Sequence, residues 1–253
     1  MARYSEEAID QLLTARREVE DEHRDLLVTL HDVALNDRVA NEHLKHGFMR
    51  RLGYIFRCIE NAYSIIPLSL QGLPDRNQLV DTTINLHAFW INIFGAMDNL
   101  AWIWVKERRI VKPNGDALPD KWIGLKRGNT IVRESFSADF KAYLERLDDW
   151  FDGIEGYRDS LAHRIPLYIP PFRVLTASQE QYYQLDAQIL AAPTHEEHER
   201  LSLEQDALKM FWPMMTHSYS ERARPIMFHA QMIADYRLMA ELARRLLNEL
   251  RKV

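Results

Sequence analysis

The sequence predicts an all-α fold, an antiparallel helical bundle with additional N- and C-terminal helices. Residues with high helix propensity dominate the 253-residue chain, whereas glycine (9) and proline (10) are sparse. Apolar residues also recur at helical spacing over long stretches. Helix-capping and helix-stopping residues stand where these stretches begin and end, which favours well-defined helices.

The first half of the chain predicts three helices. Ser5 caps an acidic first turn, and the helical pattern continues to about His31. A second helix runs from about residue 36 to 66, where a proline stops it. A third spans roughly residues 75–109. Its central part is apolar on nearly every side, which predicts that it lies in the core.

The second half begins with an expected irregular segment. Residues 110–136 contain two turn signals, Pro113-Asn114-Gly115 and Gly128-Asn129. Ser137 then caps a helix that we expect to continue through Trp150 and to bend at Gly153 and Gly156.

The last third combines a proline-rich segment with further helices. Residues 165–173 hold three prolines, which favour an extended strap because proline restricts the residue before it. We expect the helices that follow at about 178–191, 194–211 and 225–251. We find no repeat and no long linker, so residues 1–253 are interpreted as one domain.

Composition and charge narrow the function classes. A net charge of −5 gives no global basic field, which argues against a nonspecific nucleic-acid coater. The single cysteine, Cys58, cannot form an internal disulfide and favours a reducing compartment. The polar start lacks the apolar core of a signal peptide, so we expect a cytoplasmic protein.

One apolar run, residues 88–105, has almost the length of a membrane span. Asn92, Asp98 and Asn99 interrupt it. An aspartate at a bilayer centre costs roughly 2.5–3.5 kcal/mol on insertion scales. We therefore interpret the run as a helix buried in protein and expect no membrane partner.

The segment Arg158-Asp159-Ser160-Leu161-Ala162-His163 is the strongest functional signal. It places a cation, a carboxylate and an imidazole in the last turns of a helix that Pro166 forces to end. Arg158 and His163 lie about 140° apart on a straight helix, whereas Asp159 and His163 share a face. The helix dipole and Asp159 both favour a protonated imidazole.

These residue types are suited to RNA cleavage. RNA carries its own nucleophile, the 2′-hydroxyl, so a base and a cation suffice and no metal or other cofactor is required. We expect His163 to act as general acid–base and Arg158 to hold the scissile phosphate, with Arg164 in support. Asp159 would orient His163.

The motif resembles the signature of the HEPN superfamily (higher eukaryotes and prokaryotes nucleotide-binding domains). That signature is an arginine, a polar residue, three to five further residues and a histidine. The resemblance covers residues 85–171, from Asn85-Leu86-His87-Ala88 through Asp98-Asn99-Leu100-Ala101-Trp102 to Pro171. We expect the family core at about 75–171, with helical elaborations at 1–66 and 176–253.

The resemblance implies a helical bundle and, for members that cleave RNA, a metal-independent endoribonuclease. Such members use the motif arginine and histidine, here Arg158 and His163, usually in a groove between two protomers. A homodimer is therefore expected, as is a toxin or antiphage defence effector restrained by an antitoxin or regulatory protein. Many members are not nucleases and bind a nucleotide or a protein partner, which is the alternative for this chain.

Polar residues on the predicted core helix leave two interpretations open. Asp98 has core-type neighbours and needs a partner. It pairs either with the motif arginine or histidine across two central helices, or with a structural partner elsewhere. Asn85, Asn92 and Asn99 recur every seven residues, with Ala88 and Gly95 between them. That stripe forms either a polar groove or a close-packed helix seam.

Weaker signals have ordinary explanations. Glu20-Asp21-Glu22-His23 matches half of a di-iron pattern, and two further histidine pairs, at 43/46 and 195/198, have ligand-like spacing. Solvated helix faces explain all three better. The basic stretch 122–133 is either an RNA-facing loop or an ordinary exposed loop. Gly153 and Gly156 indicate close approach of a neighbouring helix or of a second subunit.

Overall fold

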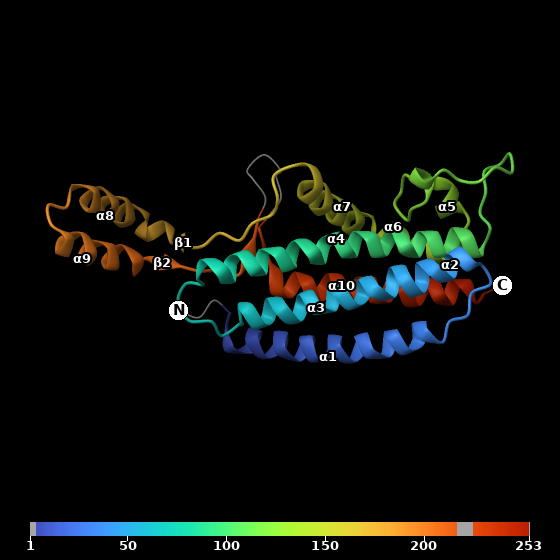
Figure 1. Ribbon diagram of the computed structural model, residues 1–253, viewed down its shortest axis with the longest axis horizontal. Helices are drawn as coiled ribbons and strands as arrows, with labels where there is room; N and C mark the ends of the chain where they lie inside the picture. Colours follow the sequence, from blue (N-terminus) through green and yellow to red (C-terminus); the bar gives the residue numbers. More distant parts are fainter. Residues whose placement is uncertain (1–3, 217–224, 253) are drawn as a thin grey trace.

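A helical bundle forms the body of the molecule. The computed structural model describes residues 4–216 and 225–252. Four long helices lie side by side along the molecule: α1 (Glu6–His31), α3 (Met49–Ile65), α4 (Arg76–Glu107) and α10 (Phe228–Leu250) (Figure 1). Helix α3 runs antiparallel to the other three. The predicted all-α bundle is thus confirmed.

Capping residues stand at the start of α1, as predicted, and also at the start of α4. The Ser5 hydroxyl accepts a hydrogen bond from the Ala8 N–H at 3.1 Å. Asp75 and Gln78 form a reciprocal capping box at the start of α4. The predicted second helix is continuous but mixed, because α2 (Arg38–Glu42), the π-helical η1 (His43–Phe48) and α3 follow one another without a break.

Helix α4 lies at the centre of the fold and packs against α3, α10 and α7 (Asp148–His163). Its buried side chains place it in the core, as predicted, but they lie along one broad face, and Val80, Ile84 and Ile91 on the opposite face are exposed. The hydrophobic core is not confined to residues 75–171, however. Helices α1, α3 and α10 contribute to the same core, and thirteen of the 23 residues of α10 are buried. The segments expected as elaborations therefore complete the bundle.

The segment between α4 and α7 combines turns and short helices. The predicted Asn114-Gly115 turn joins a Val111–Ala117 bridge, and Gly115 has a positive φ of 88°. Then follow η2 (Asp120–Trp122), α5 (Thr130–Glu134) and α6 (Ala138–Arg146).

The predicted continuation of the Ser137 helix through Trp150 is wrong. The helix breaks instead at Leu147, whose N–H donates to the carbonyl groups of Leu144 and Glu145. This tighter turn ends α6, and the buried Leu147 side chain holds the corner against the core. Helix α7 then runs through Gly153 and Gly156 to His163, and the proline strap follows as predicted.

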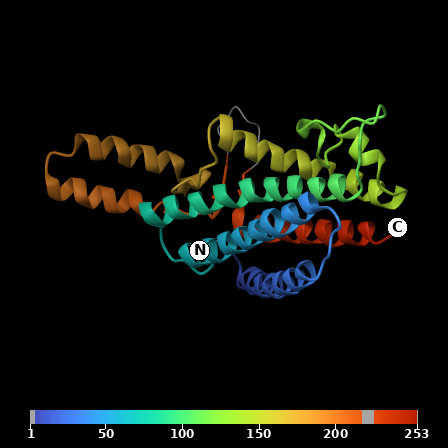
Figure 2. The same cartoon turned by 45° about the vertical axis from the view of Figure 1, so that its right-hand side comes forward.

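A helical hairpin projects from one end of the bundle, the left end in Figure 1 and again in the turned view of Figure 2. It comprises η3 (Thr176–Ser178), α8 (Gln179–Ala191) and α9 (His195–Asp206). A ribbon of β1 (Arg173–Val174) and β2 (Lys209–Met210) closes its base. Helix α9 ends before the predicted residue 211 because the chain enters this ribbon. Strands β3 (Met214–Met215) and β4 (Ile226–Met227) pair beside it.

Candidate active site on helix α7

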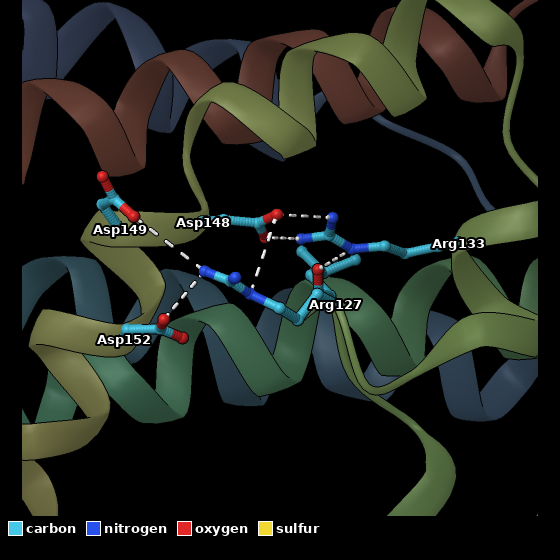
Figure 3. Close-up of polar contacts among 6 residues, drawn as sticks. Arg127, Arg133, Asp148, Asp149 and Asp152 are labelled. Carbon is cyan, nitrogen blue, oxygen red and sulfur yellow. Dashed lines mark hydrogen bonds and ion pairs between the residues drawn. The ribbon is translucent and has the colours of Figure 1, made fainter.

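An ion-pair network fixes the start of α7 to the preceding loop (Figure 3). The Arg133 side chain, 9% exposed, pairs with both carboxylate oxygens of Asp148 and donates to the Leu125 carbonyl at 2.8 Å. Arg127 donates to Asp152 at 2.8 Å. Because Asp148 lies in the first turn of α7, its charge also complements the helix dipole.

This network answers the question left open for the basic stretch 122–133. Arg133 is a buried structural residue, Arg127 pairs with the start of α7, and Lys126 pairs with Glu155. The segment is therefore neither a free basic loop nor an ordinary exposed one. It is held across α4 and α7 as the wall of a pocket.

The pocket lies between α4, α7 and residues 120–129 and has a volume of about 590 Å³. Apolar side chains supply much of its lining, among them Phe94, Met97, Trp102 and Phe151. The charged side chains in the lining include Asp98, Lys126, Glu155 and Arg158. Charged and apolar side chains thus share the lining, which makes this pocket more polar than the mostly apolar pockets typical of small-molecule sites.

Arg158 links the sequence motif to this pocket. Its Nη1 donates to the Asp159 carboxylate at 2.6 Å, and its guanidinium lies 4.8 Å from the centre of the Phe94 ring. A guanidinium over an aromatic face gains a cation–π interaction. Asp159 is therefore engaged by its neighbour Arg158, and its predicted role in orienting His163 stays a prediction.

Asp98 lies in the same pocket as Arg158, on α4. Burial raises the pKa of its carboxyl from 3.8 to about 6, although the nearby charges of Lys126, Arg158 and Arg51 oppose the shift and Glu155 adds to it. Among the described residues, no ion pair or hydrogen bond joins Asp98 to Arg158. The structure thus brings Asp98 and the motif arginine together across α4 and α7 without pairing them directly.

His163 is the last residue of α7 and is exposed. Its side chain makes no hydrogen bond or ion pair within residues 4–216 and 225–252. Arg164 follows as the C-cap, and its N–H donates to the Ser160 carbonyl at 3.1 Å. His163 is not in the lining of the Asp98 pocket. The motif histidine therefore faces solvent at the helix end, about one and a half turns from Arg158.

The strap after α7 is tied down on α4. Leu167 and Ile169 are buried, and the ring of His87 bonds the Leu167 carbonyl through Nε2 at 2.7 Å. Since a carbonyl only accepts, His87 Nε2 carries the proton. This contact fixes the direction in which the chain leaves the motif.

The glycine stripe of α7 does not pack against a neighbouring helix. A side-chain carbon placed at Gly153 or Gly156 would meet no other atom within 4 Å. Close approach within the chain is thus excluded among the described residues. Contact with a second subunit stays a prediction.

The asparagine stripe of α4 is a close-packed seam rather than a groove. The Asn61 side chain donates to Asn85 at 2.9 Å. Arg51 donates to Asn92 at 3.0 Å and to Asn99 at 3.1 Å. Gly95 gives Arg51 its space, because a Cβ there would lie 2.4 Å from the guanidinium carbon. Asn99 therefore supports Arg51 and the α3–α4 contact.

His43 and His46, which have ligand-like spacing in the sequence, bind different neighbours, and His43 belongs to the asparagine seam. Asn99 Nδ2 lies 3.0 Å from His43 Nδ1, and the His43 ring stacks on Trp102 with centres 5.0 Å apart. Burial is the main cause that lowers the pKa of His43. His46 instead bonds Arg50 at 3.1 Å. The two rings have different partners.

The half-pattern around His23 has a structural role too. His23 is buried, its Nδ1 lies 2.8 Å from the Tyr236 hydroxyl, and its ring stacks on Phe56. Glu20 is exposed. In the described part of the chain, no group of three or more His, Cys, Asp or Glu side chains is arranged to hold a metal ion.

Sequence reasoning missed a buried carboxylate on α10. Asp235 is fully buried and accepts hydrogen bonds from the indoles of Trp90 and Trp150, both at 2.9 Å, and from Gln231 at 2.8 Å. Burial raises its pKa, whereas these three donors oppose the shift. Asp235 thus joins α10 to α4 and α7. Its helical spacing from Gln231 was the only local signal.

No protein-family model, no curated protein and no solved structure matches this chain. Across residues 4–216 and 225–252, no helix combines the length and apolarity needed to cross a bilayer.

Proposed function

We propose that this protein is a metal-independent endoribonuclease of the HEPN type. The observation that supports it is the accessibility of the motif. Arg158 reaches a pocket beside α4, and His163 is exposed at the end of α7. Neither side chain is buried in the hydrophobic core. A buried motif residue would instead have favoured a purely structural role.

The proposed reaction uses the nucleophile that RNA provides. His163 takes the proton of the 2′-hydroxyl, the 2′-oxygen attacks the phosphorus, and the bond to the 5′-oxygen breaks. A protonated imidazole returns a proton to that leaving oxygen. Arg158 binds the phosphate and stabilises the charge that grows on it, after exchanging its contact with Asp159 for the ligand. The products are a 2′,3′-cyclic phosphate and a 5′-hydroxyl.

The first test is cleavage of mixed single-stranded RNA and tRNA in excess EDTA. The parent protein is expected to cleave and to leave 2′,3′-cyclic phosphate ends, and His163→Ala to lose at least 100-fold in rate, the usual contribution of a general acid–base. His195→Ala is a matched control, since His195 is also an exposed histidine and lies far along the chain on α9. Equal cleavage by parent and His163→Ala would refute the mechanism.

The proposed site is shared between two copies of the chain. Within one straight helix, Arg158 and His163 point about 140° apart, so one phosphate reaches both more easily across a dimer groove. Mixing Arg158→Ala with His163→Ala tests this arrangement. Random heterodimers restore about a quarter of the parental activity if arginine and histidine come from different copies. No recovery, with heterodimers verified by mass, places both groups in one chain.

Restraint by an antitoxin or regulatory protein belongs to the same proposal, as does a role as toxin or antiphage defence effector. Induced expression of the parent is then expected to arrest growth of the host cells. His163→Ala at the same protein level is expected not to do so. Growth arrest by both proteins would remove RNA cleavage as its cause.

The second candidate is a non-catalytic HEPN-like module that binds a nucleotide or a protein partner. The observation that favours it is that the arginine and lysine side chains in the pocket already form ion pairs. Arg158 and Lys126 are each paired with a carboxylate, Asp159 and Glu155, which lowers their attraction for a phosphodiester. Absence of cleavage by the purified parent, together with nucleotide binding, supports this candidate over the nuclease.

A further inference from the structure

We propose that the pocket between α4, α7 and residues 120–129 is a guanine-binding subsite, in which the Asp98 carboxylate accepts two hydrogen bonds from the base. The inference deepens the proposed nuclease function and rests on it for the position of the phosphate. It assigns a chemical role to Asp98 and a sequence preference to cleavage.

The first support is the shape and composition of the pocket. A volume of about 590 Å³ lies in the range of small-ligand sites. Of the aromatic side chains in its lining, Phe151 is fully buried and Trp102 stacks on His43, so Phe94, which lies beside Arg158, is the ring that a base can contact. Stacking of a base on an aromatic side chain contributes roughly 1–3 kcal/mol. The loop that forms one wall is held by the Arg133–Asp148 pair, so the pocket exists without a ligand.

The second support is the state of Asp98. Its carboxylate lines the pocket, and among the described residues it accepts no hydrogen bond. The charged groups that act on it are Lys126, Arg158, Arg51 and Glu155. Asp98 is half-buried, and its oxygens are not among the fully buried polar atoms that lack a partner, so the carboxylate is open to a ligand from the pocket. A ligand that supplies two N–H donors would compensate for the partial loss of hydration.

Guanine is the base that fits this requirement. Its Watson–Crick edge carries two adjacent donors, the ring N1–H and the exocyclic amino group, which match the two oxygens of a carboxylate. Adenine and cytosine each place an acceptor nitrogen beside their amino group, and uracil has a single N–H between two carbonyl groups. Those acceptors repel Asp98, so the pocket discriminates by pairing and by repulsion.

Arg158 sets the position of the guanine relative to the cleaved bond. The same guanidinium belongs to the pocket lining and to the motif. A nucleotide with its base at Asp98 places its own 3′-phosphate beside Arg158. That phosphate is the one attacked by the nucleotide's 2′-hydroxyl. Cleavage therefore follows guanosine, and the products end in guanosine 2′,3′-cyclic phosphate.

The preference is expected to depend on pH. Burial raises the pKa of Asp98 to about 6, so the carboxylate form is complete well above that value and is lost as the pH falls through it. A protonated Asp98 offers one donor and one acceptor and no longer matches guanine. The preference is full at pH 7.5 and small at pH 5.

The experiment measures binding of the four nucleoside 3′-monophosphates by calorimetry at pH 7.5 and pH 5. Binding of 3′-GMP is expected to be at least about tenfold tighter than that of the other three, in line with one bidentate pair. Asp98→Asn removes the preference. Asp81→Asn is the matched control, because Asp81 is an exposed aspartate on the same helix outside the pocket lining.

Each outcome decides between the two proposals. Equal binding of all four nucleotides, no binding, or an unchanged preference in Asp98→Asn overturns the subsite. If Asp98→Asn fails to fold, the comparison of the four nucleotides on the parent decides alone. His163→Ala is expected to bind 3′-GMP like the parent while losing cleavage. Cleavage without guanine preference supports the nuclease function and refutes the guanine subsite. Guanine-selective binding without cleavage supports the subsite and refutes the nuclease function.

Discussion

The bundle and the α8–α9 hairpin use the same secondary structure but bury very different amounts of it. In α10 more than half of the residues are buried, whereas α8 buries only Leu185 and α9 only Leu201 and Gln205. Large apolar side chains stay exposed on the hairpin, such as Leu190 at 85% and Leu203 at 72%. The stability of the bundle is therefore shared by all its helices, and that of the hairpin is local.

The two regions also differ in charge. Residues 175–208 hold seven Asp and Glu residues against Arg200 alone, a formal charge of −6, while the whole chain carries −5. The rest of the chain consequently has a net charge of +1. The acidic character that argued against nucleic-acid binding belongs to the hairpin. The part that carries the candidate site is close to neutral.

Helix α7 is intermediate between the bundle helices and the hairpin in the share of its residues that are buried. It buries three of its 16 residues, Phe151, Ile154 and Ser160. The remaining surface is available for chemistry, and this includes the motif. A helix with a few buried residues is thus ordered enough to position side chains and open enough to present them.

The largest effect is expected from Trp90→Ala in the bundle. Trp90 is fully buried and donates to Asp235, so the change leaves a cavity and removes a donor from a buried carboxylate. Together these cost about 3–5 kcal/mol or more of the free energy of unfolding. Urea unfolding followed by circular dichroism measures it. A loss below about 1 kcal/mol would contradict a bundle that unfolds as one unit.

Arg133→Met is expected to come next, at about 3 kcal/mol, because it leaves the largely buried Asp148 without its main partner. Arg127→Met is the control within the same network. Arg127 is 58% exposed, and its loss should cost about 1 kcal/mol or less. The same unfolding assay compares the two variants. Equal losses in the free energy of unfolding would show that burial does not determine how much each arginine contributes to stability.

Leu185→Ala is expected to affect the hairpin alone. Leu185 is the one buried side chain of α8, and removing it costs about 2–3 kcal/mol locally. Hydrogen exchange followed by mass spectrometry should show faster exchange in α8 and α9, with unchanged protection in α4 and α10. Faster exchange throughout the bundle would mean that the two regions unfold together.

The smallest effect on bundle stability is expected from removing the hairpin. Val174 and Lys209 are paired across the ribbon, so an Asn-Gly turn in place of residues 175–208 closes β1 on β2. The melting temperature of the bundle should change by no more than about 4 °C, which corresponds to roughly 1 kcal/mol for a domain of this size. Differential scanning calorimetry measures it. A shortened chain that does not fold would give the hairpin a role in the bundle.

Much of the local structure was predictable from the sequence. Ser5 and Ser137 cap helices where expected, α4 begins one residue after position 75, and α7 ends at His163, two residues before Ile165 and its proline. These features depend on side-chain contacts with the backbone a few residues away, so a short stretch of sequence is enough to predict them. The motif on α7 could be found for the same reason. The turn at Leu147 was missed because buried packing, not a cap residue, produces it.

Only the tertiary structure decided which distant residues meet. Arg158 and Asp98 share a pocket because α7 packs against α4, and Asp235 finds its two indoles 145 and 85 residues away. Likewise, Arg51 fills the space that Gly95 leaves. Such pairings follow from the packing of whole helices, in which each contact depends on all the others. Local sequence therefore determined where the helices lie along the chain, and packing determined which side chains the candidate site contains.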